Sequence, residues 1–434
     1  MTIGRRRFLA SSGLGAVSAA TALGGSSLPA QAARGRPGTG SAPVGGYLGE
    51  GDGPPQLPVT ADPAARLPAV PFHGEHQAGI LTPAPPAACF AAFDVIAPDR
   101  GSLRDLLQSM TSTARFLTSG GTPINLGTGA PPSDSGTLGP VVPADGLTMT
   151  VGVGSSLFDG RYGLEGRAPV HLGPMRSFPN DNLDPAQCGG DLLVQICACS
   201  ADTALHALRE LAKHTRGGMQ IRWRVDGFLS PSRPTGVPRN HLGFKDGIAN
   251  PAVGRPEVAD QLLWVTPGLG EPSWAAGGSY HVCRIIKMFI EFWDRVSLVE
   301  QQTMIGRFRD SGAPLGGTTE TDIPDYRQDP AGHVIPLTAH IRLANPRTRR
   351  TEPSRIYRRG YNYDRGVDLN GNLDMGLVFN CFQQNIKRQF EATQIRLIGE
   401  PMVDYVSPVG GGYFFALPGV RDSADWLGRG MLGD

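Results

Sequence analysis

One histidine and several arginines stand close together between residues 340 and 363. This stretch, HIRLANPRTRRTEPSRIYRRGYNY, combines a His-Ile-Arg run, an Asn-Pro-Arg turn and a basic segment. A neutral imidazole can ligate a transition metal or haem iron, and guanidinium groups pair with anionic oxygens such as carboxylates. The combination suits an anionic, metal-bearing cofactor. Haem is such a cofactor, because its iron needs an axial base and its propionates need cations.

A carboxylate between two glycines is the second chemical feature. It lies in GFKDGIANP, residues 243–251, where Asp246 precedes Gly247. Glycine has no side chain, so the backbone there can approach a flat ligand closely. A plain Asp-Gly turn has the same residues. The motif therefore indicates a ligand site only in combination with the basic segment at 340–363.

Length and composition indicate a globular protein of two domains. The chain has 434 residues, of which 40% are hydrophobic and 18% charged, and these values suit a sizeable core. Its formal net charge of +1 gives no overall field that would favour nucleic acid or an anionic membrane. The high counts of glycine (59) and proline (38) favour long ordered loops over a helical bundle.

The first 32 residues have the pattern of a twin-arginine export signal. Arg5-Arg6-Arg7-Phe8-Leu9 opens it, a weakly apolar run broken by glycines follows, and Ala30-Gln31-Ala32 supplies small residues for cleavage. The apolar run is too short and glycine-rich for a membrane span. We therefore expect an exported, extracytoplasmic protein whose mature chain has no transmembrane segment. Residues 33–66, rich in Gly, Pro, Ala and Ser, are expected to be a flexible linker.

The cysteines and an early His-Glu pair offer weaker metal signals. None of the six cysteines is in a CxxC motif, and Cys197-x-Cys199 in an apolar run fits the alternation of a strand. Buried free thiols are the expected state. Glu75 and His76 could ligate a metal, but no third ligand follows at a suitable spacing. The alternative is a loop whose polar groups bond to the backbone.

Hydrophobic periodicity predicts the same succession of elements twice, as α+β domains with antiparallel sheets. The first set has strands at 87–96, 147–153, 192–198 and 219–228 and helices at 102–119 and 202–214, the order of a ferredoxin-like domain. The second set has strands at 280–292, 375–382 and 412–416 and helices at 297–308 and 384–397. We predict two ferredoxin-like domains, 67–235 and 236–434, with haem held mainly by the second. His206 and His214 are expected to be surface or half-buried residues of helix 202–214.

Taken together, these motifs resemble those of the dye-decolorising peroxidases, a haem family with two ferredoxin-like halves. The similarity runs from Phe72 to Pro418. It is carried by GxxDG, HIRxxNPR, RxG and GLxF, and by RLANPR, YRRGYNY, DMGLVF and PVGGGYFFALPG. The chain is most similar to the exported deferrochelatase/peroxidase branch, which uses the twin-arginine route together with iron-uptake proteins.

The resemblance implies a role for each residue of the motifs. His340 would be the proximal ligand of the iron of haem b (iron protoporphyrin IX), and Asp246 the distal acid. Arg358 would be the distal arginine, with Arg359 as its rival because a slip of one residue exchanges them. The other cofactor contacts would be Gly247, Ile248 and Ala249 along the haem face, Asn345, Pro346 and Arg347 at its edge with Arg347 on a propionate, and Leu377 and Phe379 as a dry distal roof.

The implied activity is the oxidation of dyes, phenols or other one-electron reductants, including metal ions, by hydrogen peroxide. Asp246 would move a proton between the peroxide oxygens while Arg358 keeps it ionised. Since an ordinary carboxylate has a pKa of about 4, activity is expected to favour acidic pH. Dyes too large to enter would be oxidised at the surface through aromatic radicals, for which the candidates are Trp223, Trp264, Trp274, Trp293, Tyr361 and Tyr405.

Other functions remain open at this stage. The runner-up keeps haem but makes the chain a deferrochelatase or haem-iron acquisition factor, which takes iron from haem. A ferredoxin-like sheath or cargo protein without haem is a third alternative. A chlorite-dismutase-like enzyme shares the architecture but lacks this distal aspartate and has a shorter chain. Homo-oligomerisation and iron-uptake partners are implied by the resemblance alone.

Overall fold

The computed structural model describes residues 68–433, and the structural statements below concern this part of the chain. The predicted export signal, 1–32, and the predicted linker, 33–66, lie outside the described residues. No helix among residues 68–433 combines the length and the apolar character that crossing a bilayer would require.

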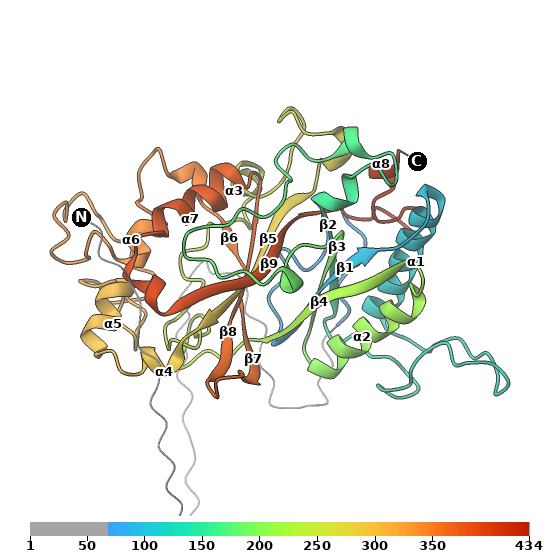
Figure 1. The fold of residues 1–434 in the computed structure, drawn as a ribbon, viewed down its shortest axis with the longest axis horizontal. Helices are drawn as coiled ribbons and strands as arrows, with labels where there is room; N and C mark the ends of the chain where they lie inside the picture. Colours follow the sequence, from blue (N-terminus) through green and yellow to red (C-terminus); the bar gives the residue numbers. More distant parts are fainter. Residues whose placement is uncertain (1–67, 434) are drawn as a thin grey trace, which may run out of the picture. The chain divides into compact units, whose positions relative to one another are not determined.

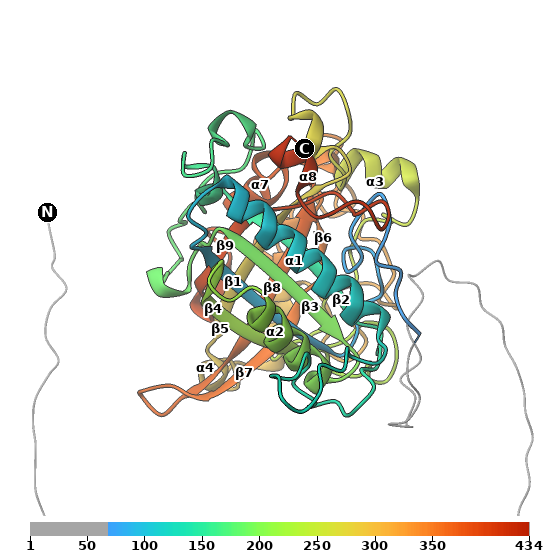
Figure 2. The ribbon, with the colours of Figure 1, turned by 90° about the vertical axis from the view of Figure 1, so that its right-hand side faces the viewer.

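The first half forms a four-stranded antiparallel sheet with two helices on one face. Its strand order, β2-β3-β1-β4, together with the chain order strand-helix-strand-strand-helix-strand, is that of a ferredoxin-like unit. Figure 2 shows α1 and α2 lying across the face of these strands. The elements are β1 (Ala87–Val95), α1 (Arg100–Ser119), β2 (Thr148–Gly154), β3 (Leu192–Ala198), α2 (Ala201–His214) and β4 (Met219–Phe228).

Helix α1 shows how the local sequence sets these elements. Asp99 caps its start, because the side chain accepts a hydrogen bond of 2.8 Å from the backbone N–H of Ser102. Gly120 ends it with a φ of +68°, which glycine adopts without strain. One face is apolar and packs on the sheet through Leu103, Leu106, Leu107, Met110 and Leu117.

The second half repeats the arrangement with longer insertions. Its strand order is β9-β5-β8-β7, with the short β6 also paired to β8. Figure 1 shows α4 to α7 on the side of the strands opposite to α1 and α2. The strands are β5 (Ser279–Met288), β6 (Tyr357–Arg358), β7 (Tyr361–Val367), β8 (Leu373–Gln383) and β9 (Val406–Ala416), and the helices are α3 (Pro256–Leu262), α4 (Ile290–Trp293), α5 (Leu298–Ile305), α6 (His340–Ala344), α7 (Ala392–Leu397) and α8 (Arg429–Leu432).

The two sheets join at both edges, so that the strands close into a ring. At one seam β2 pairs with β9, and at the other β4 pairs with β7 through the single pair Phe228 and Asn362. Between the two sheets lies an apolar layer, which includes Phe90, Val225, Ile285, Tyr361 and Phe414. Because this layer fills the space between the sheets, a ligand has to bind on the outer side of a sheet.

Two predicted elements differ from the structure, and one strand was not predicted. The strand expected at 280–292 ends at Met288, since the N–H of Phe289 turns to Tyr405 O (2.9 Å) and α4 begins at Ile290. The helix expected at 384–397 begins with a π-helical turn, Lys387–Glu391, before α7. Strand β7 was missed, because its residues were assigned to the basic segment that precedes them.

The prediction for the burial of His206 is wrong. The expectation was a surface or half-buried side chain, but His206 in α2 is only 2% exposed. The side chain of His214, the last residue of α2, is 41% exposed, in line with the expectation. Helix α2 buries His206 because a polar loop, residues 121–142, folds over that face and supplies Asp134 as a partner.

The apolar layer predicts a large stability effect. Replacing the fully buried Phe414 with Ala should lower the free energy of unfolding by about 3–5 kcal/mol, as deleting a core phenylalanine ring does elsewhere. Urea unfolding measures this change in the free energy of unfolding. Leu369→Ala is the matched control, because Leu369 is fully exposed and its loss should change stability by less than about 0.5 kcal/mol. Equal effects of the two changes would contradict a stabilising role for the inter-sheet layer.

Candidate active site

His340 opens the short helix α6 and is oriented by a carboxylate. Its Nδ1 donates to Oε2 of Glu400 at 2.6 Å, and Glu400 is buried. The His340 side chain itself is 31% exposed. With Nδ1 bonded to Glu400, Nε2 is the nitrogen that can bind a metal when the imidazole is neutral.

The charges around His340 place it with two other predicted residues. Burial lowers the pKa of the imidazole, but the Glu400 carboxylate more than offsets this, so that the pKa of His340 lies above its usual value. The charges of Arg358 and Asp246 also act on the His340 pKa. The structure therefore brings His340, Asp246 and Arg358 into one region, although they come from separate segments.

Helix α6 is short, and α7 secures its end. The Nε of Arg396 donates to Leu343 O and its Nη2 to Ala344 O, both at 2.9 Å. These are carbonyls that a helix end leaves without partners. Burial lowers the pKa of Arg396. One arginine thus fixes the C-terminal end of the helix that begins at His340.

Asp246 and Arg358 form an ion pair. The Nη1 of Arg358 lies 2.8 Å from Oδ1 of Asp246, with the two side chains 26% and 27% exposed. Arg359 points elsewhere: it is buried, and its guanidinium donates to the backbone carbonyls of Thr82 and Pro83. The placement therefore favours Arg358 over Arg359 as the partner of Asp246.

Asn250 ties the loop of Asp246 to the strand of Arg358. Its Nδ2 donates to Arg358 O at 2.8 Å, and its Oδ1 accepts from Arg358 N at 3.0 Å. At the other end of the loop, the N–H of Asp246 donates to Pro238 O at 2.9 Å. The carboxylate and the guanidinium are thus held together by their backbones as well as by their charges.

The space beside Asp246 is open. Gly247 has a φ of +107°, and a Cβ built there would meet no atom within 4 Å. Ile248 and Ala249, which follow it, are only half-buried. Glycine at 247 thus suits both the left-handed backbone and the free space in front of it.

The remaining predicted contacts occupy two neighbouring segments. Asn345 ends α6, and its Oδ1 accepts from Arg347 N at 3.2 Å, so the Asn-Pro-Arg turn with Pro346 directly follows the helix of His340. Leu377 and Phe379 lie on β8, which also pairs with β6 at Arg358. Phe379 is half-buried against Phe390, with ring centroids 6.0 Å apart.

Arginines gather around this region with too few carboxylates to match them. Burial, with the nearby cations Arg347 and Arg358, lowers the pKa of Arg307 to about 10. Buried Nε of Arg347 and the hydroxyl of Tyr326 have no hydrogen-bond partner among the described residues. Burial raises the pKa of Tyr326, and the charge of Arg347 partly offsets this.

These features fit haem. An imidazole with a free lone pair suits its iron, and unsatisfied donors on Arg347 and Tyr326 suit carboxylates such as its propionates. The half-exposed apolar residues Ile248, Ala249 and Phe379 suit its flat faces.

Other predicted features are structural. His76 Nδ1 donates to Gly277 O at 2.7 Å, and its ring stacks on Trp264 with centroids 3.7 Å apart, which matches the loop alternative and not a metal pair with Glu75. All six cysteines are free thiols within the described residues, and burial raises the pKa of each. Among the aromatic candidates, Trp223, Trp264, Trp293 and Tyr361 are buried, whereas Trp274 and Tyr405 are half-buried.

Sequence reasoning missed five residues of this region. Glu400 and Asn250 bond to His340 and Arg358. Arg307 and Tyr326 lie near Arg347, and Arg396 holds the end of α6. Asn250 stands within GFKDGIANP, where its position could have drawn attention, whereas the other four stand in no motif.

Family comparisons agree with this geometry. The descriptions "Dyp-type peroxidase, N-terminal" and "Dyp-type peroxidase, C-terminal" belong to the family models that match residues 77–229 and 237–421. A deferrochelatase of Escherichia coli O6:K15:H31 is 50% identical over 380 residues, 86% of this chain and 90% of that protein. A deferrochelatase of Yersinia pestis is 49% identical over 366 residues, 83% of this chain and 84% of that protein.

Solved structures give the same result. A DyP-type peroxidase from Cellulomonas bogoriensis is 37% identical with a TM-score of 0.75, over 84% of this chain and 98% of that one. Ferric DtpA from Streptomyces lividans is 33% identical with a TM-score of 0.75, over 84% and 97% of the two chains. On this evidence the chain belongs to the Dyp-type peroxidase family, within its deferrochelatase branch.

Proposed function

We propose that the protein is a haem b peroxidase in which His340 holds the iron and the pair Asp246–Arg358 acts on hydrogen peroxide. The observation that carries the proposal is the Asp246–Arg358 ion pair of 2.8 Å, in the same region as a histidine whose Nε2 is free. Relatives named deferrochelatase and Dyp-type peroxidase, and one named ferric, support an iron-containing cofactor.

Several side chains would hold the cofactor. His340 would bind the iron through Nε2, with Glu400 keeping the imidazole in the required tautomer. Arg347 and Tyr326 would donate to the propionates, beside the cation Arg307. Gly247, Ile248, Ala249, Asn345, Pro346, Leu377 and Phe379 would line the faces and edge. The bound iron supplies the redox chemistry.

The distal pair would handle protons and charge. Asp246 accepts a proton from one oxygen of hydrogen peroxide and returns it to the other, directly or through a water molecule. Arg358 stabilises negative charge that develops on the peroxide oxygens as their bond breaks. Asn250 keeps both groups in register, because it bonds to the backbone of Arg358 from the loop of Asp246.

A second candidate function, release of iron from haem, is favoured by the printed name of the relatives at 49–50% identity. Incubating the protein with haem, and then with hydrogen peroxide and a dye, distinguishes the two functions. Free protoporphyrin with no dye oxidation would favour the deferrochelatase, and peroxide-driven dye oxidation with intact haem would favour the peroxidase.

Export is part of the same proposal. The twin-arginine pattern at residues 5–9 supports an extracytoplasmic location. Iron-uptake partners and homo-oligomerisation, and the domain division at 235/236, stay predictions. Fractionating the cells and their medium, and probing each fraction for the chain without its signal, tests the location.

The first prediction concerns Asp246. Replacing it with Asn removes the proton acceptor but keeps the shape, and should slow the reaction of the ferric protein with hydrogen peroxide by about 10²–10⁴-fold. Stopped-flow absorbance measures the rate. Asp374→Asn, in the same strand as Leu377 but paired with Arg365, is the control. An unchanged rate in Asp246→Asn would refute the assigned role.

The second prediction concerns the ligand and its partner. His340→Ala should abolish the high-spin ferric haem spectrum, since no other group at α6 offers an imidazole. Glu400→Gln should keep haem but raise the midpoint potential of the iron, because an amide makes the imidazole a weaker donor. Absorption spectroscopy measures the haem spectrum, and redox titration measures the midpoint potential. His333→Ala, at an exposed histidine, should change neither.

The third prediction concerns Asn250. Its replacement with Ala frees the loop of Asp246, and a displacement of about 1 Å costs roughly 100-fold in rate. We expect kcat/KM for hydrogen peroxide to fall by about 10–100-fold while the haem spectrum is retained. The exposed turn residue Asn370, changed to Ala, serves as control. Full activity in Asn250→Ala would show that the ion pair alone sets the geometry.

A further inference from the structure

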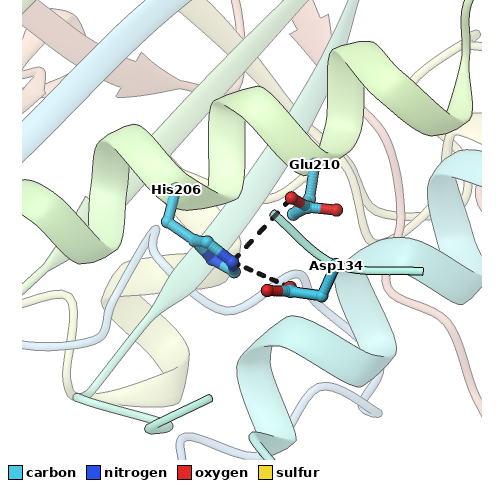
Figure 3. A group of neighbouring side chains, drawn as sticks. All are labelled: Asp134, His206 and Glu210. Atoms are coloured by element: carbon cyan, nitrogen blue, oxygen red, sulfur yellow. Dashed lines mark hydrogen bonds and ion pairs between the residues drawn. The ribbon is translucent and has the colours of Figure 1, made fainter. Parts of the chain in front are cut away.

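A buried group of three ligand-type side chains lies in the first half of the chain, on the helix side of its sheet. It consists of His206 and Glu210 on α2 and Asp134 from the loop 121–142, and Figure 3 shows their side chains pointing toward one another. Among residues 68–433 it is the one group of three or more His, Cys, Asp or Glu residues close enough to hold a metal ion. The proposed haem site does not use it.

The geometry of the three side chains suits one ion. The Nε2 of His206 lies 2.8 Å from Oδ2 of Asp134 and 3.9 Å from Oε1 of Glu210. A tetrahedral ion with bonds of about 2.0–2.2 Å keeps its ligand atoms roughly 3.3–3.5 Å apart. The metal would therefore replace the proton between His206 and Asp134 with only small shifts.

Burial leaves one carboxylate oxygen unsatisfied. The side chains of His206, Glu210 and Asp134 are 1%, 2% and 8% exposed. Oε1 of Glu210 accepts from Ser135 N at 2.8 Å, but the buried Oε2 has no hydrogen-bond partner among the described residues. An unpartnered carboxylate oxygen in the interior is costly unless a cation satisfies it.

The neighbouring cations do not fill this role. Lys213 Nζ and His214 Nε2 lie 3.7 Å and 3.6 Å from Oε2 of Glu210, beyond hydrogen-bond distance. Both side chains are more than a third exposed, and Lys213 donates instead to Pro132 O at 2.6 Å. The two carboxylates thus face His206, while Lys213 and His214 stay outside hydrogen-bond distance of Glu210 Oε2.

An open hollow adjoins the group at Asp134. The loop forms an open hollow of about 230 Å³, and Asp134 is among its lining residues. A water molecule from this hollow can complete the coordination that three protein ligands leave open. The ends of the loop are joined by two hydrogen bonds of 2.9 Å between Gly121 and Val142, so an ion bound at Asp134 would fasten its middle to α2.

We propose that Asp134, His206 and Glu210 form a binding site for a divalent first-row transition-metal ion that clamps the loop 121–142 onto α2. One imidazole and two carboxylates, with no thiolate, match ions such as Zn²⁺ or Mn²⁺; the imidazole disfavours Mg²⁺ and Ca²⁺, and the lack of sulfur disfavours Cu⁺. The site is independent of haem and of the proposed peroxidase activity.

Calorimetric titration of the chelator-treated, haem-loaded protein with Zn²⁺ tests the proposal. Bound haem blocks His340 as a competing ligand. We expect one Zn²⁺ per chain, and an affinity reduced by more than about tenfold in Asp134→Asn and in Glu210→Gln, since even outer-sphere partners are worth about 10–100-fold. His333→Ala, which removes an exposed histidine, should bind as the unchanged protein does. X-ray absorption at the zinc edge should show only nitrogen and oxygen neighbours.

Absence of saturable Zn²⁺ binding, or equal affinity in all four proteins, would overturn the proposal. Amide hydrogen exchange gives a second measurement that needs no variant. Peptides covering residues 121–142 should exchange more slowly when Zn²⁺ is present, while β9 peptides should not change. Unchanged exchange in that loop despite Zn²⁺ binding would overturn the clamp.

Discussion

The apolar layer between the two sheets is the constraint on which the rest of this structure depends. Each sheet buries one face against the other, through residues such as Phe90, Ile285 and Phe414. Helices α1 and α2 cover the second face of the first sheet (Figure 2). The long insertions of the second half are therefore the part of the chain that is free to build a site, and they carry His340, Asp246 and Arg358.

Charge compensation determines how that site is held. The imidazole of His340 and the guanidinium of Arg358 each have one carboxylate, from Glu400 and Asp246. Among residues 68–433 neither Arg307 nor Arg347 forms an ion pair with a carboxylate, and burial together with the charges of Arg347 and Arg358 lowers the pKa of Arg307 despite the nearby Glu320. An excess of cations in a partly buried region is costly without anions. An excess of cations is expected where a bound anionic ligand supplies the missing negative charge.

Much of the fold could be predicted from the sequence, because its strands and helices carry clear periodicity. Strands 192–198 and 219–228 match β3 and β4 residue for residue, whereas 280–292 ran past the end of β5. Ile290 and Trp293 are apolar because they are the buried residues of the short helix α4. In so short an apolar run, periodicity cannot distinguish a helix from a strand.

The site was only partly predictable. Motifs marked Asp246, Arg358 and His340, and the structure brings them into one region. The roles of Glu400 and Asn250 could not be read from motifs, because they depend on tertiary contacts: Glu400 lies 60 residues from its partner and Asn250 lies 108 from its own. His206 was misjudged for the same reason, since the loop that buries it comes from 72 residues earlier.

The thiols of this chain have a consequence for a protein that works with hydrogen peroxide. Peroxides oxidise the deprotonated form of cysteine to sulfenic acid, so susceptibility follows thiolate content and exposure. Burial raises the pKa of all six cysteines, to about 11 even for the half-buried Cys199. At neutral pH burial therefore keeps these thiols protonated, which is the form that peroxides oxidise slowly.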